Sequence, residues 1–361
     1  MGKLRVGILF GGKSAEHEIS LLSAKSIIDA IDRDKYEPVL IGIDKAGRWL
    51  LSRSSRLLLD SADPRFARLN PESEPVAVTP RSEGRLIGSD GGERTRIDVM
   101  FPVLHGPFGE DGTVQGLLKS ADIPFVGAGV LASAAGMDKD VTKRLLRDAG
   151  IPVARFTACR RNTVPGYAEV IAALGTPVFV KPANLGSSVG IAKVKDAATY
   201  QRAVEDALAY DTKILIEEFI TGREIECAVL GNEAPTASLP GEIIPSHEFY
   251  SYEAKYIDEH GAKLEIPARL PDQAVRRVQE LAVKTFTTLG CEGMGRVDFF
   301  LRNTGDLLVN EINTIPGFTR ISMYPRLWEA SGIAYPELID RLIRLALERF
   351  ERERNLKTSQ A

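Results

Sequence analysis

Hydrophobic residues recur along the chain with two different periods, and the first 43 residues already show both. Residues 5–10 form a continuous apolar run that ends at two glycines, and residues 39–43 form a second run. Between them, apolar residues return every three or four positions from Ile19 to Ile31, which is the period of an amphipathic helix. This order of strand, helix and strand predicts an α/β unit with a parallel sheet.

The alternation continues further along the chain after a polar interruption. Residues 53–96 are rich in Arg, Ser, Glu, Pro and Gly, and we interpret them as a surface excursion. Residues 97–104 predict another strand, and residues 112–120 predict a helix. A further helix, from about residue 138 to 149, ends at a glycine with a proline just beyond, which is a normal helix stop.

The remainder of the chain predicts a mixture of short strands and longer helices, an α+β organisation. Short apolar runs predict strands over residues 177–182, 190–194, 214–216 and 226–230. After a long polar loop come a helix at 272–289, two β-rich runs and a final amphipathic helix from 335 to about 354. The loop at about 246–267 is long and polar, and we expect it to act as a lid.

Composition narrows the class of protein. A chain of 361 residues is long enough for two or three domains, and a net charge of −3 with a pI near 6.0 makes nucleic acid an improbable partner. Cys159, Cys227 and Cys291 lack metal-site spacing, so we expect small buried side chains in a reducing compartment. No apolar run approaches the length of a membrane span, and the first strand begins too early for a signal peptide. We therefore expect a cytoplasmic protein without a membrane partner.

The two β-rich runs near residue 305 predict a hairpin that carries metal ligands. If the turn centres between Thr304 and Gly305, Asp298 lies opposite Glu311, and Asn313 shares the face of Glu311. Two carboxylates and one amide are oxygen ligands suited to Mg²⁺ or Mn²⁺. A solvated hairpin face is the alternative, but the intervening residues are apolar enough to bury both strands, where unpaired carboxylates are costly.

Two segments are candidates for binding phosphate. The first has the spacing of a P-loop, from Gly7 to Lys13 and Ser14, but residues 8–10 complete an apolar strand instead of wrapping an anion. The second runs from Lys181 to Gly190 between two predicted strands. It combines a fixed positive charge with glycines and two serines, Ser187 and Ser188, although an ordinary mobile hairpin loop is the alternative. We favour the second segment as the phosphate loop.

Acidic residues downstream of this loop complete a candidate ATP site. Glu217 and Glu218 end an apolar strand and are followed by Phe219 and Ile220, whose backbone groups can contact an adenine edge. Glu224 can accept hydrogen bonds from ribose hydroxyls, as acids do in other nucleotide sites. The order of lysine, glycine-rich loop, acidic strand end and metal hairpin predicts ATP binding.

Seven motifs, in this order and spacing, resemble the ATP-grasp superfamily and, within it, the D-alanine–D-alanine ligase family, over nearly the whole chain. They occupy residues 10–20, 105–112, 137–139, 181–190, 250–256, 295–298 and 310–317. The resemblance implies a three-domain ATP-grasp architecture with an N-terminal parallel-sheet domain at 1–137, a central subdomain at 138–225 and a C-terminal domain at 226–361. It also implies a homodimer that joins two D-alanine molecules for peptidoglycan synthesis and hydrolyses ATP to ADP.

The resemblance assigns the nucleotide and metal contacts residue by residue. Lys139 and Lys181 would hold the ATP phosphates, and Lys255 would reach the γ-phosphate as the loop closes. The remaining nucleotide contacts would be Ser187, Ser188, Glu217, Glu218, Phe219, Ile220, Glu224 and Asn310. Asp298, Glu311 and Asn313 would bind two Mg²⁺ or Mn²⁺ ions.

The resemblance also assigns the two D-alanine sites. Glu16 would pair with the first ammonium group, and His105 would lie nearby. Ser187 and Tyr256 would complete a hydrogen-bonded network with Glu16. The oxyanion would be stabilised by Arg296 and the Gly317 N–H, and the second carboxylate would be received by Ser322.

Other interpretations of these residues stay open. On its own, Glu16 is an acid favoured by the helix dipole, and His105 is a structural histidine. Residues 315–322 differ in detail from common family members, whereas Tyr256 favours a dipeptide product. Alternative functions are another ATP-grasp carboxylate–amine ligase, with D-lactate or D-serine specificity, and a nucleotide-binding regulatory protein without turnover.

Overall fold

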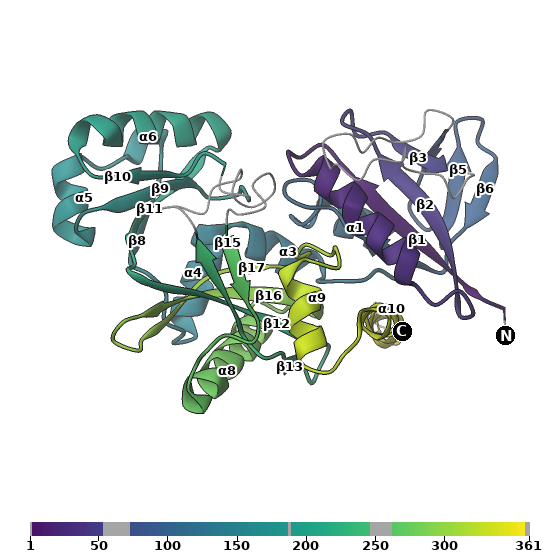
Figure 1. Cartoon of the computed structure of the whole chain (residues 1–361). Helices are drawn as coiled ribbons and strands as arrows, with labels where there is room; N and C mark the ends of the chain where they lie inside the picture. The colour runs from purple at the N-terminus through teal and green to yellow at the C-terminus, as the bar shows by residue number, and fades with distance from the viewer. Residues whose placement is uncertain (1, 53–72, 187–188, 246–261, 358–361) are drawn as a thin grey trace.

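Three sheets organise the chain, which is described here by a computed structural model covering residues 2–52, 73–186, 189–245 and 262–357. Figure 1 shows the first sheet on the right, the small central unit at the upper left, and the third sheet with its helices below and between them. The fold is mixed α/β, as the sequence predicts. The boundaries at residues 137 and 225 remain a prediction.

The first sheet has seven strands in the order β6-β5-β4-β3-β2-β1-β7. Their bounds are β1 Leu4–Gly11, β2 Tyr36–Ile43, β3 Trp49–Ser52, β4 Glu74–Ala77, β5 Arg85–Gly88, β6 Glu93–Arg96 and β7 Val99–Pro102. Strand β1 is parallel to β2 and β7, as predicted, whereas β3 to β6 are joined to the sheet by antiparallel pairs. The sheet is therefore only partly parallel.

The described part of the polar stretch at 53–96 corrects our interpretation of it as a surface excursion. Residues 73–96 form three strands that extend the sheet, and residues 53–72 lie outside the described residues. The short apolar pieces within this stretch supply the buried positions, since Val76 and Leu86 are buried. Turn-forming residues between such pieces suit tight antiparallel connections as well as loops.

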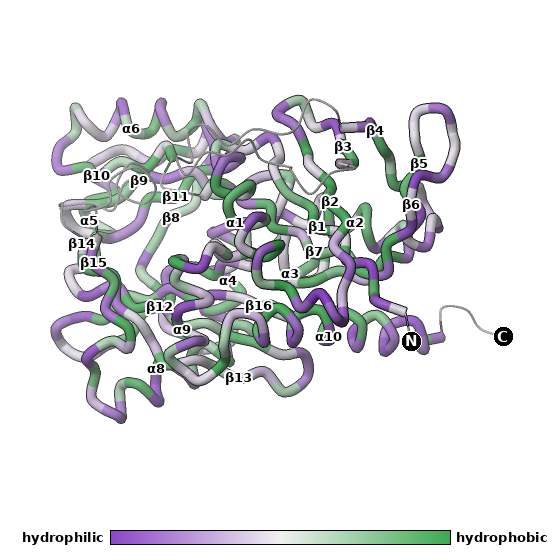
Figure 2. Tube along the Cα trace, turned by 45° about the vertical axis from the view of Figure 1, so that its right-hand side comes forward, coloured by the Kyte–Doolittle hydropathy of each residue, from purple (hydrophilic) through white to green (hydrophobic). Residues whose placement is uncertain are grey.

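Helices cover both faces of the first sheet. They are α1 His17–Ala30 and α2 Thr113–Ser120, whereas Ala132 of the next helix, α3 Val130–Met137, belongs to the core of the third sheet. One face of the sheet shares its hydrophobic core with α1 and with helices from the end of the chain, whereas the other face packs against α2. In Figure 2, β1 and β2 are largely hydrophobic, which agrees with strands buried on both sides.

The central unit is a small antiparallel sheet in the order β10-β9-β11-β8, with two helices beside it. Its elements are β8 Phe156–Arg160, the short 3₁₀ helix η2 Arg161–Thr163, α5 Tyr167–Leu174, β9 Val178–Pro182, β10 Ala192–Val194, α6 Ala197–Tyr210 and β11 Lys213–Glu218. Helix α4, Lys139–Asp148, precedes this unit. Its Leu146 belongs to the hydrophobic core of the third sheet.

The third sheet contains the predicted hairpin and runs in the order β15-β14-β12-β16-β17, with β13 paired to β12. Its elements are β12 Gly222–Gly231, β13 Thr236–Ala237, β14 Gly241–Pro245, β15 Ala262–Glu265, α8 Asp272–Thr288, β16 Gly293–Arg302, β17 Leu307–Asn313, α9 Met323–Ala330 and α10 Tyr335–Arg354. Strands β14 and β15 pair with each other. Residues 246–261, most of the predicted lid, lie outside the described residues. Residues 262–265 form β15, so this part of the predicted lid is a strand and not a loop.

The first and third units share a continuous core through the C-terminal helices. Phe318 contacts Phe101 of β7 with ring centroids 5.6 Å apart, and it also packs against Tyr324 and Tyr335. The three cysteines are unpaired and buried, which confirms the expectation of small buried side chains. None of the helices in the described ranges is both long and hydrophobic enough to cross a lipid bilayer.

Candidate active site

The hairpin of β16 and β17 places Asp298 directly opposite Glu311, as predicted, but for a different geometric reason. Leu301 pairs with Leu307, so the turn centres on Thr304, half a residue earlier than we expected. A bulge between Asp298 and Phe299 then shifts the register by one residue. The extra residue is Asn310, and such bulges redirect side chains near functional sites.

Two polar side chains donate hydrogen bonds to Asp298. Arg296 donates from Nε and Nη2 to the two carboxylate oxygens, both at 2.7 Å, and Asn313 Nδ2 donates to Oδ2 at 2.9 Å. Arg296 also pairs with Glu226 at 2.9 Å. Burial alone would lower the pKa of Arg296, but the carboxylates of Asp298 and Glu226 raise it well above its ordinary value. Arg296 therefore stays charged at every relevant pH.

The donor set of this hairpin fits a hard divalent cation. Asp298, Glu311 and Asn313 offer two carboxylates and one amide, and the described residues contain no larger cluster of acidic, histidine or cysteine side chains that could hold a metal. Within the described chain, the buried Oδ1 of Asn310 has no hydrogen-bond partner. A small number of protein ligands is enough for Mg²⁺, because this ion usually keeps several waters and binds substrate phosphates.

Lys139 connects the hairpin to the predicted phosphate loop. Its Nζ donates to the Leu185 carbonyl at 2.7 Å and lies 3.6 Å from Glu311 Oε2. The lysine is buried at the first position of α4, directly after the capping residue Asp138. The structure thus brings one predicted phosphate contact, the loop and one predicted metal ligand together.

Lys181 belongs to a cluster of three buried ionisable side chains. Lys143 and Lys181 both form ion pairs with the carboxylate of Glu217, and the three residues are 0%, 6% and 3% exposed. Burial lowers the pKa of Lys143 despite the attraction of Glu217. Burial would raise the pKa of Glu217, but the two lysines lower it overall. Glu217 therefore remains a carboxylate that holds both lysines.

The other predicted nucleotide contacts follow Glu217 along the chain. Glu218 is bound to Arg155 through its Oε1 and Oε2 and to Arg302, so its side chain joins β11 to neighbouring segments. The Phe219 ring lies below Lys193 Nζ at 4.2 Å. Ile220 follows β11, and Glu224 lies half-buried on β12. Their roles toward a nucleotide remain predictions.

His105 is held as a neutral imidazole between the N-terminal sheet and residues 315–318. Its Nδ1 lies 3.0 Å from the Ile315 carbonyl, so Nδ1 carries the proton and Nε2 is the acceptor. Burial lowers the pKa of His105, although the nearby Glu16 opposes that effect. Ser23 lies 3.5 Å from Nε2 and accepts from the Phe318 N–H at 3.4 Å. These contacts tie α1 to the predicted oxyanion loop.

Glu110 also binds the predicted oxyanion loop, through the backbone N–H of Ile315. Its Oε1 accepts from the Gly106 N–H at 2.9 Å, and its Oε2 accepts from the Ile315 N–H at 3.3 Å. Burial and the neighbouring carboxylates of Glu16 and Glu311 raise the pKa of Glu110 to about 8. Both backbone groups of Ile315 are therefore bound by residues of one N-terminal loop.

Glu16 lies at the start of α1 with its carboxyl near two glycines of different units. A Cβ on Gly106 would lie 3.1 Å from Glu16 Oε2, and a Cβ on Gly186 would lie 3.7 Å from the same atom. Glu16 makes no side-chain cap of the helix. The structure thus places this carboxyl beside both His105's loop and the phosphate loop, where the network with Ser187 was predicted.

Gly317 and Ser322 lie side by side. A Cβ on Gly317 would meet Ser322 Oγ at 3.1 Å, and Ser322 Oγ also lies 2.7 Å from Thr319 Oγ1. The hydroxyl turns back toward Thr319 and does not cap α9. The two residues predicted for the oxyanion and the second carboxylate are therefore adjacent.

Four predicted residues cannot be placed. Ser187, Ser188, Lys255 and Tyr256 lie outside the described residues. In the alternative P-loop, residues 7–11 belong to strand β1 and only residues 12–14 lie in a loop. Ile8, Leu9 and Phe10 are fully buried in β1, and the Lys13 ammonium lies over the exposed Phe108 ring at 4.7 Å.

The sequence analysis missed several residues of this site. Lys143 lies four positions after Lys139, so helical spacing could have placed both on one face of α4. Glu226 and Ser23 have no such local signal, because their partners Arg296 and Phe318 are distant in sequence. Glu110 lies within the motif at residues 105–112, but nothing in the sequence shows that it contacts Ile315.

Comparisons with known proteins decide the family. The family model described as "D-ala D-ala ligase N-terminus" matches residues 5–128, and "D-ala D-ala ligase C-terminus" matches residues 145–344. The chain belongs to the D-alanine–D-alanine ligase family. A D-alanine–D-alanine ligase of Shouchella clausii is 52% identical, with 99% of each chain covered.

Solved structures of this ligase family have the same fold. The D-alanine–D-alanine ligase of Coxiella burnetii has a TM-score of 0.86 and 40% identity, covering 98% of this chain and 97% of its own. The VanG D-Ala:D-Ser ligase of Enterococcus faecalis has a TM-score of 0.85 and 36% identity, covering 96% of this chain and 100% of its own. The ATP-grasp architecture and the family resemblance are confirmed, and family membership implies use of ATP and a divalent metal.

Proposed function

We propose that the protein joins two D-alanine molecules into D-alanyl-D-alanine, using ATP, to supply peptidoglycan precursors. One short segment carries this proposal. Residues 310–317 hold the predicted metal ligands Glu311 and Asn313 and the predicted oxyanion donor Gly317, while Ile315 between them is bound by His105 and Glu110. Phosphate transfer and amide formation would then take place at two ends of one fixed segment.

The first step would be attack of the first D-alanine carboxylate on the γ-phosphate of ATP. Glu16 would hold the ammonium group of that substrate, and Lys139 and Lys181 would hold the phosphates. Divalent ions at Asp298, Glu311 and Asn313 would offset the charge that develops on the phosphate oxygens. Phosphoryl transfer depends mainly on such positioning and electrostatics.

The second step would be attack of the second amine on the acyl phosphate. The C–N bond forms at the acyl carbon, inorganic phosphate leaves, and the amine loses a proton. Arg296 is permanently charged and rigidly held by Asp298 and Glu226, so it needs no reorganisation to stabilise the tetrahedral oxyanion together with the Gly317 N–H. Ser322 beside Gly317 would orient the second carboxylate.

The test is a coupled measurement of phosphate release with D-alanine or L-alanine as the amino acid. We expect phosphate only with D-alanine, in equal amount to the dipeptide detected by mass spectrometry. Nucleotide binding without D-alanine-dependent ADP formation would instead support the regulatory alternative.

A D-serine or D-lactate acceptor is the second candidate, and the similarity to a D-Ala:D-Ser ligase is the observation that favours it. Mixed acceptors separate the products. An attacking amine must be neutral, so dipeptide formation should rise between about pH 6 and about pH 8.5, whereas the uncharged hydroxyl of D-lactate needs no such deprotonation. Tyr256→Phe should increase the relative use of D-lactate. Preference of the wild type for D-lactate or D-serine at both pH values would contradict D-alanine as acceptor.

We also propose two Mg²⁺ or Mn²⁺ ions per site, a homodimer and a cytoplasmic location. The oxygen-only donor set of the hairpin supports the choice of metal, and family membership supports the homodimer and the location. Activity after removal of the metal and readdition of each ion tests the choice of metal. Sedimentation velocity tests the homodimer.

A further inference from the structure

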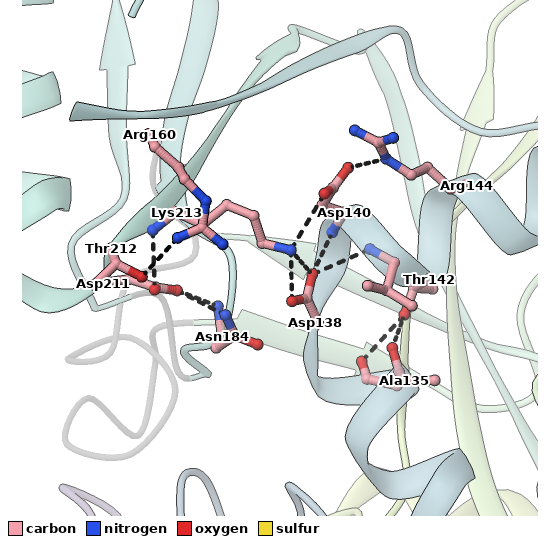
Figure 3. Close-up of polar contacts among 12 residues, drawn as sticks. Ala135, Asp138, Asp140, Thr142, Arg144, Arg160, Asn184, Asp211, Thr212 and Lys213 are labelled. Carbon is pink, nitrogen blue, oxygen red and sulfur yellow. Dashed lines mark hydrogen bonds and ion pairs between the residues drawn. The ribbon is translucent and has the colours of Figure 1, made fainter. Parts of the chain in front are cut away.

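Lys213, the first residue of β11, lies where three segments of the site meet. Its Nζ donates to Asp138 Oδ1 at 2.7 Å and to Asp140 Oδ2 at 3.2 Å. Figure 3 shows the lysine pointing from its strand toward the start of helix α4, where both carboxylates lie. Asp138 is the capping residue of that helix and also accepts from two of its backbone N–H groups. The ammonium therefore fixes β11 to the first turn of α4.

The backbone of Lys213 holds the predicted phosphate loop. Its carbonyl accepts from the Ala183 N–H at 3.0 Å, and the Ala183 carbonyl accepts from the Lys139 N–H at 3.0 Å. Lys139 directly follows Asp138, so these bonds and the ion pair close a ring through Lys213, Asp138, Lys139 and Ala183. The ring joins β11, α4 and the end of β9.

A neighbouring residue fixes the next position of the loop. Asp211 Oδ2 accepts from the backbone N–H and the Nδ2 of Asn184, at 2.8 and 3.0 Å, and its Oδ1 accepts from the Lys213 N–H at 3.1 Å. The close-up in Figure 3 shows Asn184, Asp211 and Lys213 on one side of the same network. The first two residues after Lys181 and Pro182 are thus attached to residues 211–213.

We propose that Lys213 is a positioning residue for the nucleotide: it sets the separation between the Lys139 ammonium and the phosphate loop. This inference rests on the proposed assignment of Lys139 and residues 181–190 to the ATP phosphates. Lys139 Nζ contacts the Leu185 carbonyl at 2.7 Å, so a shift of the first turn of α4 would move this cation relative to the loop. Lys213 would act through Asp138 and the backbone of Ala183, without contacting the nucleotide.

Arg144 provides a matched control in the same network. It pairs with Asp140 Oδ1 at 2.6 Å from within α4, and its side chain is 60% exposed, against 14% for Lys213. Arg144→Met therefore removes one cation from Asp140 but leaves the connection between α4 and β11. Lys213→Met removes that connection and keeps a side chain of similar length.

The experiment compares binding of ADP with Mg²⁺ by titration calorimetry, together with the KM for ATP and for D-alanine, in the wild type, Lys213→Met, Arg144→Met and Lys213→Arg. We expect Lys213→Met to weaken ADP binding and raise the KM for ATP by about five- to tenfold, with the KM for D-alanine changed less than about twofold. Arg144→Met should stay within about twofold of the wild type, since exposed ion pairs contribute little. Lys213→Arg should recover most of the lost affinity because it keeps the charge.

Two results would overturn the inference. One is unchanged nucleotide binding in Lys213→Met, and the other is an equal loss toward ATP and D-alanine, which indicates general loosening. If Lys213→Met does not fold, Asp138→Asn decides, because asparagine keeps the helix cap but removes the charge of the nearer of the two carboxylates that bind Lys213. It should weaken ADP binding, and unchanged binding would overturn the inference. If the wild type fails to bind ADP, the proposed function itself is overturned. If the wild type binds ADP normally and the variant is unaffected, only the role of Lys213 is overturned.

Discussion

The two sides of the site bury polar groups in opposite ways. On the nucleotide side, Lys143 and Lys181 are buried and both form ion pairs with Glu217, and the two lysines lower the pKa of that carboxyl group. On the substrate side, His105 is neutral, and Glu110 has a pKa of about 8 while it accepts hydrogen bonds from backbone N–H groups. Burial disfavours the charged form of a group, whereas an oppositely charged neighbour favours it.

This difference predicts where the protein is sensitive to charge and where it is sensitive to pH. Removing a charge should be most harmful on the side where charges are paired, because each removal leaves a buried partner uncompensated. Titration should matter most on the side where a carboxyl group is held close to its neutral form. Four substitutions test the contrast.

The largest effect on the rate should come from the hairpin, where the carboxylates are the proposed metal ligands. Glu311→Gln keeps the size of the side chain but removes a charge from the proposed metal site. Loss of one fixed electrostatic group at a reacting centre costs about 10²–10³ in kcat, and we expect at least that loss. The measurement is phosphate release over a Mg²⁺ titration, with circular dichroism to check folding.

Asp306→Asn is the matched control for this prediction, because Asp306 is an exposed carboxylate at the turn of the same hairpin. It should leave kcat nearly unchanged. A near-normal rate for Glu311→Gln at saturating Mg²⁺ would contradict the metal assignment.

The second effect concerns stability on the nucleotide side. Glu217→Gln leaves Lys143 and Lys181 buried without a negative partner, and breaking a buried pair in this way costs about 3–5 kcal/mol of unfolding free energy. Lys143→Met leaves the Lys181–Glu217 pair intact and should cost less. Urea unfolding of both variants measures the difference. Equal losses would show that the cluster does not depend on its single carboxylate.

The third effect concerns nucleotide affinity. Lys181→Ala should weaken ATP binding by about tenfold or more, which is ~1.4 kcal/mol, because a buried cation beside the phosphate loop is lost. Lys13→Ala removes an exposed cation over an aromatic ring, a contact worth only about 0.5–1 kcal/mol. It should leave ATP affinity nearly intact. The reverse ranking in a nucleotide titration would restore the P-loop interpretation of residues 7–14.

The last effect is a change in pH dependence on the substrate side. The pKa of Glu110 rises from an ordinary 4.5 to about 8 on folding, so the folded protein keeps a proton that the unfolded chain has lost. Stability from this group is complete below pH 4.5 and falls as pH rises toward 8, by at most about 1.4 kcal/mol per pH unit. Partial exposure of the side chain reduces the pKa shift and therefore the total change in stability.

Glu110→Gln removes the titrating group, so the free energy of unfolding should depend less on pH between about pH 5 and about pH 8. Glu93→Gln, at an exposed carboxylate on β6, is the control and should keep the wild-type slope. Identical slopes in the wild type and Glu110→Gln would show that Glu110 is ionised throughout this range.

The sequence alone determined most of the elements and much of the candidate site. Hydrophobic periodicity predicted β1, α1, α8 and α10 with nearly their observed bounds, because burial of one face is a local pattern. The same kind of reasoning placed Asp298 opposite Glu311. It failed at residues 73–96 and at β14 and β15, where short strands with polar residues depend on neighbours distant in sequence.

Tertiary structure decided the contacts between these elements. The bulge at Asn310 corrects the hairpin register, and the ring through Lys213, Asp138 and Ala183 joins segments that no motif connects. Glu110 and His105 reach Ile315 across more than 200 residues of chain. Sequence periodicity fixes which side of an element is buried, but which buried polar groups meet depends on how the packed elements satisfy one another's hydrogen bonds and charges.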